Sequence, residues 1–469
     1  MKKELKLFLV LALTAALSAC RGKPDVKYVF YLIGDGMGIN QVMATEQYNQ
    51  ATGKGPEQIN FAHFPVRGFV TIVSASSLVT DSAAGGTALA TGVKTYNSAI
   101  GVNADTVAVP SVADWAREAG AGVGIITSVG VNHATPASFV AHTDKRGNYE
   151  TIATQIIETP VDFVAGGGFI TEKKTGHTAA YFEDMAREAG ISVFYGPAFE
   201  DMASVEGRVI CLSGKEGSDL PYAIDRKEDD TSLSDLVKAG IDYLEGRFAQ
   251  KGFFMMIEGG KIDYGGHGQD AATCFQELSD FANAIDLVLA FYERHPKQTL
   301  IVVTADHETG GLMLGAGKYE INPGRLAAQK VSKDALTTLF RSTFFPEGQS
   351  YKTPSWVDVK AFFARELGLW ESVTVSKSAE AHLKDIYDQT FGKNGNKDLS
   401  ETNLYSVNSK LVSEAVICLD NAAGFKWSYG SHSGSPVGLY VKGAGQEAFV
   451  SVKDNAEIAP TVAKLTGWK

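Results

Sequence analysis

Acidic and histidine side chains directly follow three apolar segments of strand length. These side chains are Asp35, Glu258 and the adjacent pair Asp306 and His307. Each has an ordinary explanation when taken alone: Asp35 suits a helix N-cap, Glu258 a surface acid, and the pair a turn. Packing does not explain why three apolar segments all end in this way. Carboxylate oxygen and imidazole nitrogen are the usual zinc ligands of hydrolytic sites, so the pattern predicts a metal centre.

Two further ligand types lie close to Glu258. The sequence Glu-Gly-Gly-x-x-Asp-x-x-x-His places Asp263 and His267 after it, with three residues between the acid and the imidazole. Taken alone, His267 is simply one of nine histidines in the chain. In combination with the other acids it extends the predicted metal centre. The glycines of Asp-Gly-x-Gly, which begins at Asp35, allow a tight turn and the close approach of a bulky group.

Ser82 is the candidate nucleophile. It stands in Thr-Asp-Ser-Ala-Ala-Gly-Gly-Thr-Ala, where small residues predict a helix that begins near the serine and packs closely against its surroundings. A helix N-terminus favours an anion, although a plain N-cap serine would look the same. The sequence has no histidine near Ser82 and no Gly-x-Ser-x-Gly motif. A hydroxyl without a base can be activated by a metal, which favours a metal-assisted mechanism.

Continuous apolar runs indicate strands that are buried on both faces. Such runs cover residues 28–33, 122–127, 252–257 and 299–304, with helical stretches such as 111–119 and 271–293 between them. This alternation predicts an α/β fold, a three-layer sandwich in which helices flank a central, mostly parallel sheet. Ligands of such sheets bind beyond the carboxyl ends of the strands, where the acids lie.

A more polar stretch interrupts this pattern at about residues 320–410. It contains candidate helices at 334–342, 357–367 and 377–387, so we predict a mainly helical insertion in a catalytic domain that spans residues 28–469. Strand-like runs return at 415–419 and 438–441.

The first twenty residues have the features of an export signal. Two lysines precede a short apolar run that ends in Leu-Ser-Ala-Cys, and the run is too short to span a bilayer. This ending resembles a bacterial lipobox, in which Cys20 carries lipid; the alternative is an ordinary cleavable signal. We expect a signal peptide at 1–20, a tether at 21–27, and an exported protein held in the periplasm or at the outer membrane by its lipid.

Composition excludes some functions. The formal net charge of −11 and pI near 5.4 argue against a nucleic-acid-binding surface, but they allow a phosphate site, because metal ions supply positive charge locally. Cys211, Cys274 and Cys418 permit at most one internal disulfide and have no metal-binding spacing. We expect them to be small buried side chains.

Seven short motifs together resemble the alkaline phosphatase family, in its order along the chain. They are residues 33–38 (IGDGMG), 80–84 (TDSAA), 133–137 (HATPA), 141–146 (AHTDKR), 258–263 (EGGKID), 304–307 (TADH) and 431–434 (SHSG). The resemblance covers about 28–315 and 410–469, and it is closest to the bacterial lipoprotein type. It implies hydrolysis of phosphate monoesters through a phosphoserine at Ser82, assisted by two zinc ions and one magnesium ion.

The resemblance also implies a role for each matching residue. The first zinc would be held by Asp263, His267 and His432, and the second, beside Ser82, by Asp35, Asp306 and His307. The magnesium ligands would be Asp35, Thr135 and Glu258, and Arg146 would grip the substrate phosphate. The family is usually dimeric, so a homodimer is possible.

Two positions vary within the family. His133, close to the magnesium site, leaves the identity of the third metal open, and Tyr264 would either donate to phosphate or only pack. Ser82 lacks the Cys/Ser-x-Pro-x-Arg context of a sulfatase, and an export signal does not suit a phosphoglycerate mutase of this superfamily. A phosphodiesterase of the same superfamily and a lipoprotein that only binds phosphate or metal remain as alternatives.

Overall fold

The computed structural model describes residues 25–196, 202, 205–214, 218–315, 319–346, 353–391, 401–402 and 407–469. The predicted signal peptide with Cys20, and most of the predicted tether, lie outside these residues.

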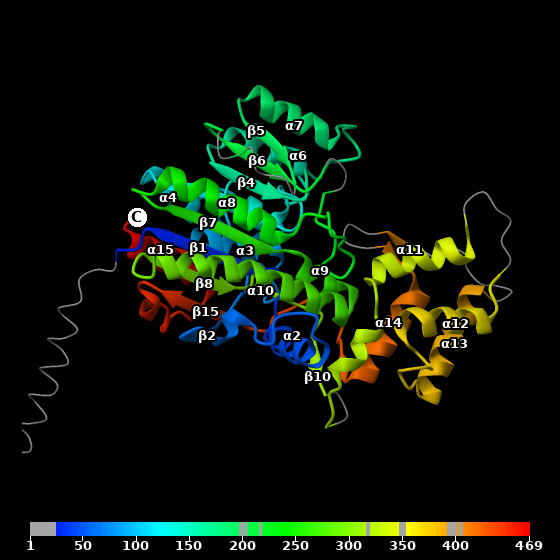
Figure 1. The fold of residues 1–469 in the computed structure, drawn as a ribbon. Helices are drawn as coiled ribbons and strands as arrows, with labels where there is room; N and C mark the ends of the chain where they lie inside the picture. Colours follow the sequence, from blue (N-terminus) through cyan, green and yellow to red (C-terminus); the bar gives the residue numbers. More distant parts are fainter. Residues whose placement is uncertain are drawn as a thin grey trace, which may run out of the picture.

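A nine-stranded sheet forms the centre of the described chain (Figure 1). In spatial order its strands are β2 (Val66–Val70), β15 (Val437–Gly443), β8 (Thr299–Thr304), β1 (Tyr28–Gly34), β7 (Phe253–Gly259), β3 (Gly122–Thr127), β4 (Phe163–Gly166), β6 (Val209–Leu212) and β5 (Ser192–Tyr195). β15 is antiparallel to both of its neighbours, and the other pairs are parallel. The mostly parallel sheet and four of its predicted strands are thereby confirmed.

Helices cover both faces of this sheet (Figure 1). On one face lie α2 (Ile39–Thr52), α8 (Leu233–Phe248) and α10 (Ala271–Arg294), and on the other α3 (Ser82–Thr91), α4 (Val112–Glu118), α5 (Ala134–Ala137) and α15 (Ile458–Thr466). The remaining helices of this part are α6 (Tyr149–Glu158), α7 (Ala179–Glu188), α9 (Lys261–Gly268) and the 3-10 turns η1 (Asn60–His63), η4 (Gln446–Phe449) and η5 (Asn455–Glu457). No described helix is both long enough and apolar enough to cross a bilayer.

The central strands are continuous apolar runs because both of their faces are covered. Every residue of β1, β3, β7 and β8 is buried. Phe30 and Phe253 pack edge to face with Phe291 of α10, at ring-centroid distances of 5.2 and 5.4 Å. Burial of one such ring contributes about 1.5–3 kcal/mol, so this packing fixes the strands that carry the acids.

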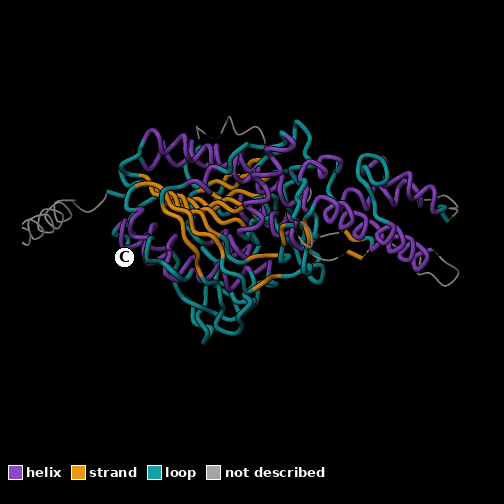
Figure 2. Tube along the Cα trace, turned by 90° about the horizontal axis from the view of Figure 1, so that it is seen from below, coloured by secondary structure: helices purple, strands orange, loops and turns teal. Residues whose placement is uncertain are grey.

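The stretch predicted as an insertion contains three helices close to those expected from the sequence. They are α11 (Lys333–Phe344), α12 (Trp356–Leu367) and α13 (Lys377–Phe391), preceded by η3 (Pro323–Ala328) and followed by the short strands β11 (Glu401–Thr402) and β12 (Val407–Asn408). In Figures 1 and 2 these helices lie to one side of the sheet, packed with α14 (Lys410–Ala423).

The strand predicted at residues 415–419 is wrong, since these residues lie inside α14. Five consecutive apolar residues fit a buried strand and a buried helix equally well, and periodicity cannot separate the two over so short a run. Burial of Leu411, Val412, Ala415, Val416 and Leu419 follows the helical spacing that places one face against α11, α12 and α13. The strand predicted at 438–441 is confirmed as part of β15.

The insertion is anchored beside α9. The buried carboxylate of Asp270 accepts hydrogen bonds from the Gln329 side chain and from the backbone N–H of Lys333. The Lys333 ammonium donates to the Gly268 carbonyl at 2.9 Å, at the end of α9, where a cation suits the helix dipole. The three described cysteines are free and buried, as expected of small core residues.

Candidate active site

Because the parallel strands are in register, the predicted acids lie together at the carboxyl ends of these strands. Ile33 of β1 pairs with Glu258 of β7 on one side and with Thr304 of β8 on the other. Asp35 and Asp306 each follow within two residues, so Asp35, Glu258 and Asp306 converge and are fully buried. Asp35 is not a helix cap, because the N-cap of α2 is Gly38.

Gly36 permits the close approach that the Asp-Gly-x-Gly pattern predicts. Its φ is +70°, a left-handed conformation that glycine adopts without strain. A Cβ at this position would lie 2.8 Å from both the Asp263 Cα and the Thr309 Oγ1. The turn after β1 can therefore touch α9 and the segment after β8 only if residue 36 has no side chain.

Three oxygens surround the Nε2 atom of His307. The Ser82 Oγ lies 3.2 Å from it, and one carboxylate oxygen each of Asp35 and Asp306 lies 3.3 Å from it. Ligands held at about 2.0–2.1 Å from a tetrahedral zinc ion are about 3.3 Å apart. The spacing of these four atoms therefore fits a shared cation, and the residues are those predicted for the second zinc and the nucleophile.

A second group consists of Asp263 and His267 on α9 with His432 on β14 (His432–Ser433). The two Nε2 atoms are 3.1 Å apart, and the Asp263 carboxylate lies 3.3 Å from His267 and 3.7 Å from His432. The four-residue spacing on α9 places Asp263 and His267 on one face of the helix. These residues are the set predicted for the first zinc.

A backbone carbonyl holds the other nitrogen of each of these two imidazoles. His267 Nδ1 lies 2.9 Å from the Gly430 carbonyl, and His432 Nδ1 lies 3.1 Å from the Thr80 carbonyl. A carbonyl can only accept, so Nδ1 carries a proton in both rings, and it is Nε2 that loses its proton and offers a lone pair when a metal binds. Both rings are thus held in the tautomer that a metal ligand needs.

The third group combines Asp35 and Glu258 with His133. Thr135, predicted as a magnesium ligand, lies on α5, of which His133 is the N-cap, and both are buried. Within the described chain, several buried oxygens make no hydrogen bond of ordinary geometry: both of Asp35, one each of Glu258 and Asp306, and the Thr135 hydroxyl. Buried oxygens without donors are costly, and a bound cation would satisfy them.

Electrostatics also indicates a cation. Burial, followed by repulsion from neighbouring carboxylates, raises the pKa of Asp306 to about 8 and that of Asp35 well above its usual range. Burial raises the pKa of Glu258 to about 7. Burial acts on Asp263 in the same direction, but the adjacent His267 and the other imidazoles hold its pKa below the ordinary value. So many buried acids are compatible with ionisation only where positive charge is added.

Ser82 begins α3 and is buried, but it is not the cap. Asp81 is the N-cap, and its carboxylate accepts from the Ala84 N–H at 3.0 Å. The Arg146 guanidinium donates to Asp81 at 3.3 Å and to the Ser82 Oγ at 3.4 Å, and its other terminal nitrogen lies 3.0 Å from the His133 Nε2. Burial and the nearby Arg146 lower the pKa of His133 to about 3, so this ring accepts as a neutral imidazole.

Several residues that form hydrogen bonds with the predicted site residues were not predicted from the sequence. Thr309 donates to the Asp263 carboxylate at 2.5 Å and lies 3.2 Å from the His307 Nδ1, while Thr127 donates to Glu258. Asp81 belongs to the motif around Ser82, and its role as helix cap and partner of Arg146 is visible only in the structure. Threonines carry no separate signal in a sequence, because their partners are set by tertiary contacts. Tyr264 is buried with its ring edge-on to that of His133, at a centroid distance of 6.4 Å.

A family model described as alkaline phosphatase matches residues 26–183 and 206–467. The chain belongs to the alkaline phosphatase family. Alkaline phosphatase 4 of Bacillus subtilis is 30% identical over 458 residues, which cover 94% of this chain and 89% of that protein.

Solved alkaline phosphatases share the fold. The cold-active alkaline phosphatase of a psychrophilic Shewanella sp. matches with a TM-score of 0.75 and 28% identity, over 94% of this chain and 99% of that one. A histidine-to-glutamate variant of TAB5 alkaline phosphatase with magnesium bound matches with a TM-score of 0.65 and 25% identity, over 96% and 100%. The family and the fold together show that this chain is a phosphomonoester hydrolase, as the ordered motifs predicted.

Proposed function

We propose that this chain hydrolyses phosphate monoesters by transferring the phosphoryl group to Ser82 and then to water. The observation that carries the proposal is the convergence on one hydroxyl: the Ser82 Oγ lies 3.2 Å from the His307 Nε2 and 3.4 Å from the Arg146 guanidinium. A candidate nucleophile, a candidate metal ligand and a phosphate-binding cation thus meet at a helix N-terminus.

The ligand groups support two zinc sites and one magnesium site. Asp263, His267 and His432 would hold one zinc ion; Asp35, Asp306 and His307 would hold the other; Asp35, Thr135 and Glu258 would hold magnesium. When bound, such cations act as Lewis acids on phosphate and ester oxygens and lower the pKa of a hydroxyl. Sites that include imidazole nitrogen favour zinc and the all-oxygen site favours magnesium, although His133 beside the latter keeps other metals open.

The residues of the chain bind and orient the phosphoryl group. The N-terminus of α3 and the Arg146 guanidinium present N–H donors beside Ser82, and Asp81 with His133 fixes the direction of that guanidinium. A planar guanidinium can donate to two phosphate oxygens at once. A monoester then still has a third charged oxygen free for other ligands, whereas a diester has only two charged oxygens.

Each chemical step is a displacement at phosphorus. The Ser82 Oγ loses its proton and forms a bond to phosphorus while the bond to the ester oxygen breaks, and the leaving oxygen takes up a proton and departs as the alcohol. Water then forms the next bond to phosphorus, and the bond to the Ser82 Oγ breaks, which releases inorganic phosphate and restores the hydroxyl. Most of the rate enhancement comes from positioning and electrostatic stabilisation.

We also propose export of this enzyme to the periplasm or outer membrane, with lipid on Cys20. The basic start, the short apolar run and the Leu-Ser-Ala-Cys ending of the first twenty residues support this location. A homodimer is the third part of the proposal, supported by membership of a family that is usually dimeric. Light scattering from the chain without its signal peptide tests the dimer, and a monomeric mass contradicts it.

Hydrolysis of p-nitrophenyl phosphate, compared with its bis-ester at alkaline pH, tests the activity. The assay is run before and after treatment with EDTA, and again with zinc and magnesium restored. Rapid monoester cleavage that EDTA abolishes and the metals restore supports the proposal. Preferential diester cleavage would move the protein to a phosphodiesterase function, and turnover of neither ester would favour a lipoprotein that only binds phosphate or metal.

A further inference from the structure

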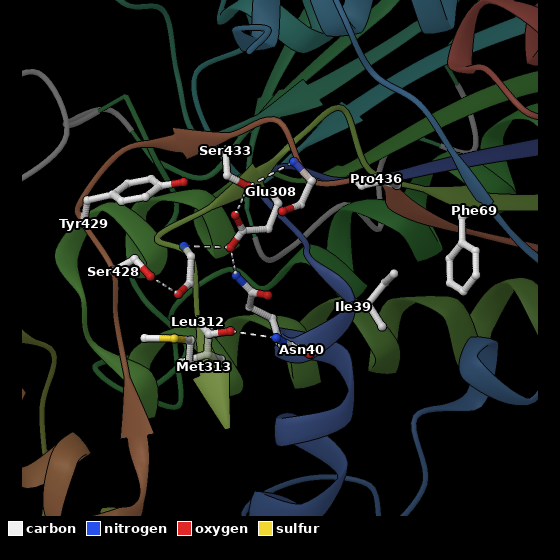
Figure 3. A pocket seen from close by; sticks show the side chains of 13 residues that line it. Ile39, Asn40, Phe69, Glu308, Leu312, Met313, Ser428, Tyr429, Ser433 and Pro436 are labelled. Carbon is white, nitrogen blue, oxygen red and sulfur yellow. Dashed lines mark hydrogen bonds between the residues drawn. The ribbon is translucent and has the colours of Figure 1, made fainter. Parts of the chain in front are cut away.

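A two-stranded ribbon with two different faces carries part of the candidate site. β9 (Glu308–Thr309) pairs antiparallel with β14, so that His432 lies opposite Thr309 and Ser433 opposite Glu308. Directly opposite residues share a face, and successive residues alternate. Thr309 and His432 contact Asp263, whereas Glu308 and Ser433 line a cleft of about 600 Å³ on the other face (Figure 3).

The Glu308 carboxylate is an acceptor shared by three segments of the chain. One of its oxygens accepts from the Gln41 side-chain amide and from the Gly311 backbone N–H, each at 2.9 Å. The other accepts from the Ser433 hydroxyl (Figure 3). Only 6% of the residue is exposed, so these three donors replace the water that an ionised carboxylate would otherwise bind.

Each of these segments also carries a predicted metal ligand. Gln41 lies in the first turn of α2, six residues after Asp35, and its amide also donates to the Thr309 carbonyl at 2.8 Å. Ser433 directly follows His432 on β14, and Glu308 itself directly follows His307. The carboxylate therefore joins the turn after β1, the segment after β8 and the ribbon strand β14.

The last glycine of the Asp-Gly-x-Gly motif is explained by the same contact. A Cβ on Gly38 would lie 2.4 Å from the Glu308 Cγ and 2.3 Å from the Gln41 amide oxygen. Residue 38 must therefore be glycine for the Glu308 side chain to cross over the turn. Gly38, in the motif that contains Asp35, thus leaves the room that the side chain of Glu308, the residue after His307, occupies.

We propose that Glu308 is a positioning residue that holds Asp35, His307 and His432 in their relative places. The proposal rests on the metal sites of the proposed function. Glu308 belongs to none of the acid and histidine groups of the described chain that could hold a metal ion, and it acts through hydrogen bonds alone. Loss of a residue that holds metal ligands through hydrogen bonds typically lowers the metal affinity by about 10- to 100-fold.

Three variants test the proposal: Glu308→Gln, Ser433→Ala and the double variant. An amide in place of the carboxylate keeps the size of residue 308 but replaces one acceptor oxygen by an N–H₂ donor. Both carboxylate oxygens of Glu308 accept hydrogen bonds, so the N–H₂ group would meet another donor in either orientation of the amide. Glu183→Gln is the matched control. Glu183 is similarly buried, with 5% exposed, and bonds to Tyr195 and Arg187 far from the ribbon.

The measurements are made on full-length protein loaded with Co²⁺. They are the rate of cobalt release to a chromophoric chelator, the visible absorption spectrum of the bound cobalt, and the thermal midpoint of the loaded protein. We expect Glu308→Gln to release cobalt about 10- to 100-fold faster, with an altered spectrum. Ser433→Ala should show a smaller effect, the double variant should resemble Glu308→Gln because both changes break one interaction, and Glu183→Gln should behave as wild type.

Wild-type release rates and spectra in both Glu308→Gln and Ser433→Ala would overturn the proposal. A Glu308→Gln protein that does not fold leaves the decision to Ser433→Ala, which removes one hydrogen bond from the surface of the cleft. Faster release that Glu183→Gln shows equally would also overturn it, because loss of any buried carboxylate would then suffice. A wild-type protein that retains no cobalt would overturn the metal assignment itself, and this proposal with it.

Discussion

Removal of the metals should make the stability of the fold depend on pH with a definite sign. Without metal, burial raises the pKa of Glu258 to about 7 and that of Asp306 to about 8, from ordinary values of 4.5 and 3.8. Between about pH 4 and pH 8 the folded protein therefore binds protons that the unfolded chain has released. The free energy of unfolding then falls as the pH rises through this window.

Glu258 gives the magnitude. Its carboxyl is fully buried, and the interval from 4.5 to about 7 corresponds to about 3 kcal/mol at 1.36 kcal/mol per pKa unit. Asp306 acts in the same direction, and so does His267, because the neighbouring Asp263 raises its pKa to about 9 despite burial. A bound cation favours the ionised carboxylates and neutral imidazoles, so metal-loaded protein should lack this part of the pH dependence.

Urea unfolding of EDTA-treated and metal-restored protein, between about pH 5 and pH 9, measures the difference. Other buried acids, such as Glu277 with its pKa raised by burial to about 7, titrate in both forms and cancel in the comparison. Metal-free Glu258→Gln should lose about 3 kcal/mol less over this range than the metal-free wild type. Metal-free stability that is independent of pH, or that rises from pH 5 to pH 8, would refute the reasoning.

Four further predictions concern single residues. Ser82→Ala should lose most turnover of p-nitrophenyl phosphate and keep the wild-type thermal midpoint, and near-normal turnover would exclude Ser82 as the nucleophile. Arg146→Ala should raise the inhibition constant for inorganic phosphate while the metal content stays the same; an unchanged constant would contradict its role as the phosphate clamp. Gly36→Ala should cost about 1–3 kcal/mol of stability through overpacking against Asp263, whereas Gly53→Ala, at φ +67° with nothing within 4 Å of its added Cβ, isolates the cost of the backbone conformation. Equal losses in the two glycine variants would refute the packing argument. Cys20→Ala should give active protein that no longer sediments with membranes, and continued membrane association would argue against lipidation.

Local sequence patterns were sufficient for much of the fold. The apolar runs at 28–33 and 299–304 favour strands covered on both faces because they are rich in β-branched and aromatic residues, and the structure has β1 and β8 there. The run at 415–419 was misread as a strand because five apolar residues carry no period. Only its packing against neighbouring helices, which no local pattern contains, makes it part of α14.

For the candidate site, the order of the residues was enough to show which ligand types follow the strands. This predicts a metal centre, and the family that the ordered motifs resemble implies phosphate chemistry. The sequence could not place the His307 Nε2 beside the Ser82 Oγ across 225 residues, nor join Glu308 to Ser433 across 125. These contacts depend on the register of β1, β7 and β8 and on the β9–β14 ribbon. Register is decided by the packing of the whole sheet, so only the tertiary structure turns a set of suitable side chains into a site.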